Sequence, residues 1–255
     1  MHNKDKNNVT SKDVALLAGV SQSTVSRAFS KHTNLSPETK RKVMEAAKIL
    51  NYQPNAFARN LILSRSNFIG IVKGYTRNSA FSEMLSELVN LIQRSNRQVI
   101  YFETEKGQSI DDIMTHVLQY RIEGLILLYA NLSSELTLSC QQRGIPVLQA
   151  LRYSTSVKTN VVLPDNYKAA EEAATLFIEK GFRNFVYLAG EVNSSSNMER
   201  QLGFLRKLHE YGFLNPIVYQ GDYTYESGVA AIHSLRKKLP FPCAILCAND
   251  LMAFG

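Results

Sequence analysis

A polar segment near the start of the chain, Gln22 to Ser30, carries side chains that can hydrogen-bond to the edges of DNA bases. Gln22 can pair with adenine and Arg27 with guanine, because each offers two polar groups that match one base edge in the major groove. A helix here would place Ser23, Ser26, Arg27 and Ser30 on one arc, and Thr24, Val25, Ala28 and Phe29 on the opposite arc. The polar, charge-poor arc favours DNA reading, with an ordinary helical hairpin as the alternative.

Two short helices joined by a tight turn, over Val9 to Ser30, would position these side chains. Thr10 can cap the first helix, with Asp13 near the backbone donors of its first turn. Gly19 ends that helix, because glycine accepts a positive φ, and Ser21 can cap the second. The expected apolar face of the first helix consists of Val14, Leu17 and Ala18.

A third helix completes a small head domain over residues 9–53, behind a disordered tail at 1–8. Ser36 is its expected cap, and Pro37 fits the first helical position, where no backbone N–H is needed. Asn34, in the loop before this helix, can reach DNA backbone or bases. The inward face is predicted to be Val43, Ala47 and Leu50.

The charge of the chain is concentrated at this end. Residues 1–66 hold eleven of the 29 basic residues and four of the 22 acidic ones, a net charge of +7, which is also that of the whole chain. The remaining residues hold 18 of each sign and are neutral. Excess positive charge beside a helix-turn-helix is what binding to phosphates requires.

The segment 54–66 separates the head from the rest of the chain as a linker. Gln53-Pro54 prevents a simple continuation of the third helix. The stretch from Asn55 to Leu63 resumes a helical pattern, with Asn55 as a possible cap, but it is too short to be stable alone.

From Phe68 onward, strands and helices alternate, which predicts an α/β body with parallel sheets. Two such units, lobe 1 over 67–152 and lobe 2 over 153–255, match a two-lobed periplasmic-binding-protein architecture. The expected fold class is therefore α + α/β. Ligands of such sheets bind at the carboxyl ends of the strands, here in the cleft between the lobes. The first unit is expected to contain the buried strands FIGIV, QVIYF, GLILLY and PVLQAL. The second is expected to open with the strand NVVLP and to continue with FVYLAG, IVYQG and the buried AILCAND. The helices expected are 81–95, 110–120, 135–143, 167–180, 198–211 and 227–238.

No pattern for catalysis, a metal or a cofactor stands out. The glycines near Gly74 and Gly190 do not form a dinucleotide fingerprint, and no nucleophile elbow is present. Cys243 and Cys247 read as core residues of a strand. No signal peptide or membrane-spanning stretch is evident, so we expect a cytoplasmic protein with no membrane contact. The five histidines are scattered through the tail, a loop and helices: His2, His32, His116, His209 and His233.

Three segments together resemble the LacI/GalR family of transcriptional regulators: VTSKDVALLAGVSQSTVSR, SPETKRKVMEAAKILNYQPNAFARNL, and the sugar-binding-protein-like body. The resemblance implies a repressor that binds a pseudo-palindromic DNA operator as a homodimer. It also implies that 54–66 contains a hinge helix, in which Leu61 wedges into the minor groove and Ala58 allows close approach. The resulting candidates for DNA contact are Thr10, Ser21, Gln22, Ser23, Thr24, Ser26, Arg27, Asn34, Asn55, Ala58 and Leu61.

The same resemblance implies a small-molecule effector, a sugar or related metabolite, between the lobes. It places Arg200 against effector hydroxyl or carboxylate groups, and Asn249 and Asp250 at a strand end facing the cleft. Phe81 matches an aromatic residue that lines the first lobe. Leu151 stands where many relatives have an aspartate that binds sugar hydroxyls, which disfavours a free hexose.

The family pattern continues past Gly255 with strands and helices that complete lobe 2 and return to lobe 1. The sequence is thus either a fragment or a naturally shortened regulator, and a shortened form could be inactive or interfere with the full-length protein. A different class is also open: a solute-binding module or sugar-processing α/β enzyme with a vestigial head. The basic head argues against it.

Overall fold

The computed structural model describes residues 9–29, 34–53, 66–75, 81–154 and 158–255. The chain forms two compact units, residues 1–66 and residues 67–255. Each unit has a hydrophobic core of its own. Within the described ranges, no helix is both long and apolar enough to cross a membrane.

The described residues of the first unit form three short helices whose ends follow the sequence signals. Ser21 and Ser36 accept hydrogen bonds from the backbone N–H groups of Thr24 and Thr39, so both predicted N-caps are confirmed. Gly19 has a φ of 64°, as predicted for the end of the first helix. The helices are α1 Ser11–Ala18, α2 Gln22–Ala28 and α3 Pro37–Ile49.

The core of the head differs from the prediction at one position of α1. Leu17 is 50% exposed, whereas Ala15 is buried next to Val14. The expectation that Leu17 packs inward was wrong. The face of α1 that packs against the other two helices contains Val14 and Ala15 instead. The buried side chains of the head are Val14, Ala15, Val25, Ala28, Val43, Ala46 and Ala47.

The second unit begins with a five-stranded parallel sheet of order β2-β1-β3-β4-β5. Two expectations need correction. The strand at 160–162 pairs with β4, so it belongs to this first sheet and does not open the second lobe. The strand at 98–103 is an edge strand and is not buried, because only β1 pairs with it. The strands are β1 Phe68–Lys73, β2 Gln98–Glu103, β3 Gly124–Leu128, β4 Val147–Ala150 and β5 Asn160–Val162.

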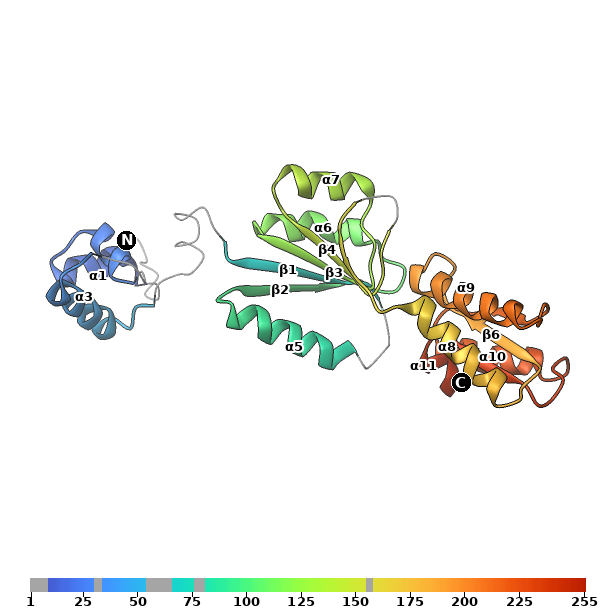
Figure 1. The fold of residues 1–255 in the computed structure, drawn as a ribbon. Coiled ribbons are helices and arrows are strands. Elements are labelled where there is room, and N and C mark those ends of the chain that lie inside the picture. The colour runs from blue at the N-terminus through green and yellow to red at the C-terminus, as the bar shows by residue number, and fades with distance from the viewer. Residues whose placement is uncertain (1–8, 30–33, 54–65, 76–80, 155–157) are drawn as a thin grey trace, which may run out of the picture. The chain divides into compact units, whose positions relative to one another are not determined.

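In the ranges that the structure describes, three helices cover this first sheet, and sheet and helices together are lobe 1. Figure 1 shows α6 and α7 on one face and α5 alone on the other. The two faces have separate cores, one around Met114 and Leu125, the other around Ile71 and Phe81. The helices are α5 Phe81–Arg94, α6 Ile110–Gln119 and α7 Ser134–Gln142.

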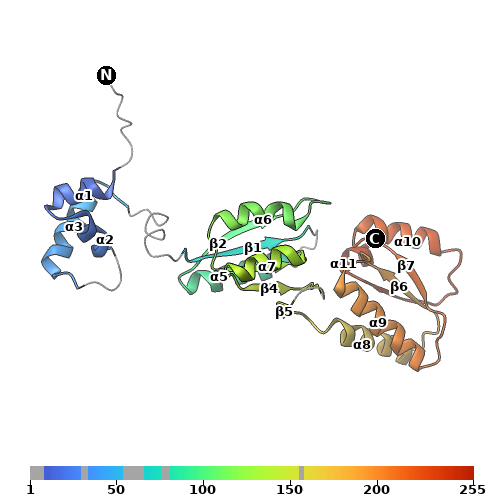
Figure 2. The same cartoon turned by 90° about the horizontal axis from the view of Figure 1, so that it is seen from above.

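Lobe 2 is a three-stranded parallel sheet of order β7-β6-β8 with helices on both sides. All five residues of the central strand β6 are buried, and Figure 2 shows α8 and α9 on one side and α10 on the other. Cys243 and Cys247 pack against this core, as predicted. The elements are α8 Asn166–Glu179, β6 Phe185–Ala189, α9 Ser195–Glu210, β7 Ile217–Gln220, α10 Tyr225–Leu235, β8 Ala244–Cys247 and α11 Asp250–Phe254.

Candidate functional site

The outward face of α2 is polar and open to solvent. Gln22, Ser23, Ser26 and Arg27 are exposed, whereas Val25 and Ala28, on the opposite side, are 1% and 2% exposed. The helix is therefore held by its apolar residues and presents its hydrogen-bonding residues outward. In the described part of the head, Arg27 makes no hydrogen bond or ion pair, so its guanidinium donors are available.

Several other polar candidates of the head already have partners within it. Asp13 accepts hydrogen bonds from the backbone N–H and the hydroxyl of Thr10, at 2.8 and 2.7 Å. The hydroxyls of Ser21 and Thr24 lie 2.9 Å apart. Gln22 Nε2 donates to Ser11 Oγ at 2.9 Å, which fixes the side chain across the turn between α1 and α2.

Of the remaining DNA-contact candidates, the structure describes the loop residue but not the three linker residues. Asn34 is exposed just before the cap of α3. The predictions for Asn55, Ala58 and Leu61 fall on positions outside the described residues.

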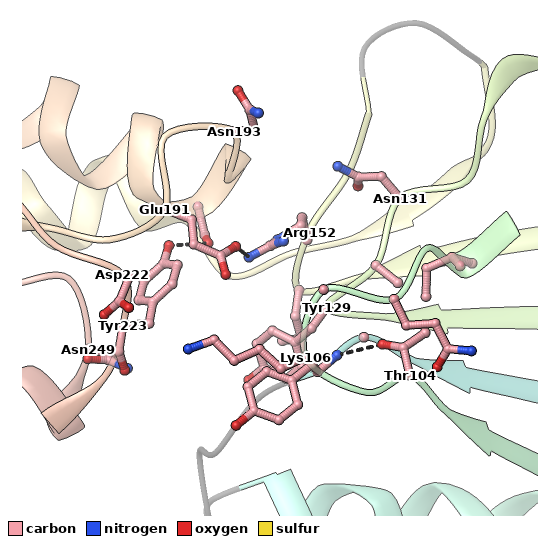
Figure 3. Close-up of a pocket in the computed structure, with 18 of the residues that line it drawn as sticks. Thr104, Lys106, Tyr129, Asn131, Arg152, Glu191, Asn193, Asp222, Tyr223 and Asn249 are labelled. Carbon is pink, nitrogen blue, oxygen red and sulfur yellow. Dashed lines mark hydrogen bonds and ion pairs between the residues drawn. The ribbon is translucent and has the colours of Figure 1, made fainter. Parts of the chain in front are cut away.

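A second candidate site is a cavity of about 420 Å³ in the 67–255 unit. Its walls come from the loops that follow the strands of both sheets, so it lies at the carboxyl ends of both. Figure 3 shows Tyr129 and Arg152 on the lobe 1 side, and Glu191 and Tyr223 on the lobe 2 side. This is the position at which parallel α/β sheets bind small ligands.

Strained backbone shapes the lobe 1 wall. Tyr129 and Leu151, which follow β3 and β4, have φ values of 53° and 68°, in the left-handed region that side chains other than glycine's rarely adopt. A Cβ on Gly74 would overlap the backbone carbonyl of Tyr129, so only glycine allows this approach. Left-handed residues that gather around a cavity are typical of functional sites.

The lobe 2 wall is built around Tyr223, which also has a left-handed φ of 68°. Its hydroxyl lies 2.8 Å from Ser194 Oγ, and a Cβ on Gly190 would overlap its ring. Asn249 holds the same segment, because its side-chain amide donates to the Tyr223 carbonyl at 2.8 Å and its Oδ1 caps α11 at Met252. The ring is thereby fixed at the edge of the cavity.

Charged side chains of both signs line the cavity. Arg152 Nη2 and Glu191 Oε2 form an ion pair of 3.0 Å between the two lobes. The Thr224 hydroxyl and backbone N–H donate to Asp222, and these bonds hold the pKa of its carboxyl below the ordinary value. Burial raises the pKa of the Tyr129 phenol, although Arg200 and Arg152 oppose that shift.

A hydrogen-bond chain ties the crossover between the lobes to helix α9. The Tyr153 hydroxyl donates to Glu199 Oε1 at 3.0 Å, and Asn166 Nδ2 donates to Glu199 Oε2 at 3.1 Å. Arg200 Nε then donates to Asn166 Oδ1 at 2.9 Å, while its Nη1 donates to the Ala248 carbonyl. Arg200 therefore lines the cavity in a fixed orientation.

The four predicted effector residues are not all brought together. Arg200 and Asn249 line the cavity, whereas Asp250 is exposed at the start of α11 outside it. These three residues together line a second hollow, at the end of β8. Phe81 is buried in the core of lobe 1, where its ring contacts Tyr129 at a centroid distance of 5.6 Å. It supports the cavity wall from behind and does not line the cavity.

Sequence reasoning missed Lys106, Tyr129, Arg152 and Tyr223, which all line the cavity. A usable signal was present, because each lies within four residues of the end of a predicted strand. No group of three or more histidine, cysteine or acidic side chains that could hold a metal ion occurs among the described residues.

Both parts of the chain match known protein families. Residues 10–55 match the family described as bacterial regulatory proteins, lacI family. Residues 66–255 match the family described as periplasmic binding proteins and sugar binding domain of LacI family. The chain belongs to the LacI family. It is a DNA-binding transcriptional regulator with a sugar-binding-type body, and proteins of this family are regulators rather than enzymes.

Individual LacI-family proteins align along nearly the whole chain. Catabolite control protein A of Priestia megaterium is 28% identical over 97% of this chain and 76% of its own length. The transcriptional regulator MalR of Streptococcus pneumoniae is 32% identical over 97% of this chain and 78% of its own. The lac repressor dimer bound to operator and the anti-inducer ONPF superposes with a TM-score of 0.83, at 26% identity, over 97% of this chain and 76% of that one.

Proposed function

We propose that the exposed face of α2 reads the base sequence of an operator in the DNA major groove. Gln22 and Arg27 are the two side chains on this face able to make bidentate contacts to a base. The observation that carries the proposal is their exposure on a helix whose other side is buried. The Gln22–Ser11 hydrogen bond uses one amide proton and leaves the second proton and the carbonyl for a base.

The other head candidates take a positioning role in this proposal. Thr10, Ser21 and Thr24 bond within the caps of α1 and α2, and their position at the helix starts suits contact with phosphate. Ser23, Ser26 and Asn34 are exposed and can reach bases or backbone. Contacts of this kind fix the register of the helix, and the net +7 of residues 1–66 supplies the attraction that depends on salt.

We infer that the protein binds DNA as a homodimer, on two half-sites of a pseudo-palindrome. The support is the likeness to the lac repressor dimer bound to operator. Two recognition helices related by two-fold symmetry read half-sites about one helical turn apart, and a single helix cannot do so. Residues 54–66 would act as the hinge, with Asn55 capping, Ala58 at the close approach and Leu61 as the wedge.

The cavity between the lobes is the proposed effector site, occupied by a sugar or related metabolite. A ligand changes DNA affinity only if it binds one arrangement of the lobes more tightly than the other. Contacts to both walls, from Tyr129 and Tyr223, would give that difference. Binding without chemical turnover suffices for this role, and we propose no catalytic activity. The operator lies in the bacterial cytoplasm, and so we place the protein there.

Selection of bound duplexes from a random DNA pool tests this function. We expect enrichment of one pseudo-palindromic site and an affinity for it that falls steeply as salt rises, because phosphate contacts release counterions. The same protein should bind scrambled duplexes at least about 1,000-fold more weakly. Equal, weak affinity for every duplex would overturn the proposal.

A further inference from the structure

The end of lobe 2 that lies opposite the cavity is formed by the three loops that lead into its strands. The strands β6, β7 and β8 are parallel and start level with one another, so these loops share one end of the sheet (Figure 2). Asn184 Nδ2 donates to the Pro242 carbonyl at 3.1 Å and joins two of the loops. The Arg183 guanidinium lies over the Phe213 ring, 5.9 Å from its centre, and joins the third. We call this surface, which consists of residues 180–184, 211–216 and 236–243, the basic end of lobe 2.

The basic end of lobe 2 carries charge of one sign. Its three loops contain five cationic side chains and no acidic one, whereas residues 67–255 as a whole are neutral. All five cations are exposed, and none forms an ion pair with another described residue. Glu179 and Glu210 precede the loops, and Glu210 is already paired with Lys207 at 2.7 Å. The five cations are Lys180, Arg183, Arg236, Lys237 and Lys238.

The helices that end at this surface account for only part of its charge. A cation near the C-terminus of a helix is favourable because of the helix dipole, and this applies to α8 and α10. The effect falls off within one turn, so a single cation after each helix meets it. Three consecutive cations, residues 236–238, follow α10 and repel one another. A negatively charged partner removes this repulsion, whereas the dipole of one helix does not.

Large apolar side chains are exposed among these cations. Phe241 is 73% exposed and Leu214 is 70% exposed. Phe241 stands between Pro240 and Pro242, whose rings restrict the backbone, so a partner that buries it loses less binding free energy to conformational entropy. Aromatic side chains and arginine most often dominate the binding energy of protein interfaces. The surface therefore combines positive charge with an apolar anchor.

We propose that the basic end of lobe 2 docks an acidic segment of another protein, in which carboxylates surround at least one apolar side chain. The carboxylates pair with the five cations, and the apolar side chain packs against Phe241 and Leu214. The phosphates of a nucleic acid match the cations but leave both apolar side chains in water. Two exposed apolar side chains offer little area to a bilayer, whereas they suffice for the centre of a protein interface.

Binding of labelled peptides to the full chain, measured by fluorescence anisotropy, tests the proposal. The acidic peptide repeats Glu-Asp-Leu-Asp. The amide peptide replaces each carboxylate by its amide, and the serine peptide replaces each leucine by serine. We expect the acidic peptide to bind about tenfold or more tightly than the amide peptide, and several-fold more tightly than the serine peptide. Added salt should weaken the acidic peptide, because exposed charges are screened.

Charge variants distinguish the basic end of lobe 2 from the basic head, which also attracts acids. The double variant Lys237→Gln/Lys238→Gln should weaken binding of the acidic peptide about three- to tenfold. The matched control is Lys40→Gln/Lys48→Gln, which removes the same charge from exposed positions of α3 and should leave the affinity unchanged.

An apolar variant tests the anchor separately. Phe241→Ser should weaken the acidic peptide several-fold and leave the serine peptide unaffected, because the serine peptide has no apolar side chain to pack against this position. Leu138→Ser, at a 54% exposed position of α7 in lobe 1, is the matched control and should change neither affinity.

Equal affinity for the acidic and amide peptides overturns the proposal, and so does an absence of binding by the acidic peptide. An equal loss in the two double variants would assign the binding to the head and overturn it as well. A random duplex and vesicles of phosphatidylglycerol and phosphatidylcholine are the other probes. If Lys237→Gln/Lys238→Gln weakens one of these and not the peptide, the surface serves a different class of partner and the proposal is wrong.

Discussion

Arg152 and Glu191 form an ion pair of 3.0 Å that links the end of β4 in lobe 1 to the loop after β6 in lobe 2. Glu191 is half exposed, whereas Arg152 is mostly shielded. The pair therefore joins the two lobes at the wall of the proposed effector cavity.

Glu191→Gln should change the separation of the lobes more than it changes stability. A pair with one half-exposed partner contributes about 0–1 kcal/mol, so the free energy of unfolding should fall by no more than that. Without ligand, the variant should populate more open arrangements, measurable as a larger radius of gyration by solution scattering. Glu210→Gln, which removes the two ion pairs of Glu210 with Arg206 and Lys207 outside the cavity, is the matched control. Equal radii of gyration in wild type and Glu191→Gln would contradict the prediction that this ion pair holds the lobes together.

Gly74→Ala should destabilise lobe 1, because the added methyl group overlaps the Tyr129 carbonyl. Overpacking against backbone costs about 1–3 kcal/mol, since the strand end and the loop must move apart. Gly124→Ala is the control, as its nearest neighbour, Ile69 Cδ1, lies at an ordinary contact distance of 3.4 Å. Urea unfolding of the two variants gives the comparison. A smaller loss of stability for Gly74→Ala than for the control would show that the close contact between residue 74 and the Tyr129 carbonyl does not require glycine.

The pH dependence of stability should contain a contribution from Asp222. Hydrogen bonds from Thr224 lower the pKa of this carboxyl in the folded state. A lowered folded pKa stabilises the protein above the unfolded pKa of about 4, and this stabilisation is lost as the pH falls through the folded value. Asp222→Asn should therefore lower stability at pH 6 and lose less on acidification. Urea midpoints at pH 6 and pH 3 measure this; Glu172→Gln, at an exposed position of α8, should behave like the wild type.

The local signals in the sequence predicted the helices and their ends well. Ser21, Ser36 and Gly19 act through the backbone within a few residues, so their effects depend little on the rest of the fold. Leu17 was misplaced, because the buried face of a two-turn helix depends on the partner helices. The strand at 160–162 was misassigned to lobe 2, because its partner β4 is decided by non-local pairing.

The cavity was predicted in position but only partly in composition. The rule that ligands bind at the carboxyl ends of parallel strands located it, and Arg200 and Asn249 lie there. Tyr129 and Tyr223 were missed although both lie close to predicted strand ends, since their contacts with Gly74 and Gly190 join parts of the chain that are distant in sequence. Phe81 was predicted to line the first lobe of the effector site, but its side chain is buried in the core of lobe 1.

The hinge prediction concerns the bending of DNA. If Leu61 wedges between base steps, Leu61→Ala should reduce the bend in the selected duplex, because an apolar side chain holds the unstacked step open. The thermal stability of the head should not change. Gel mobility of circularly permuted DNA fragments measures the bend. An identical bend with wild type and variant would contradict the wedge.

The most direct test of base reading by α2 is the specificity of Arg27→Ala on the selected operator and its single-base variants. We predict that this variant loses about 1–3 kcal/mol on the operator and no longer discriminates at one base pair of each half-site. Lys40→Ala, which removes an exposed cation of α3, should weaken binding to all duplexes equally and keep the discrimination. An Arg27→Ala protein that still distinguishes every base pair as the wild type does would contradict the account.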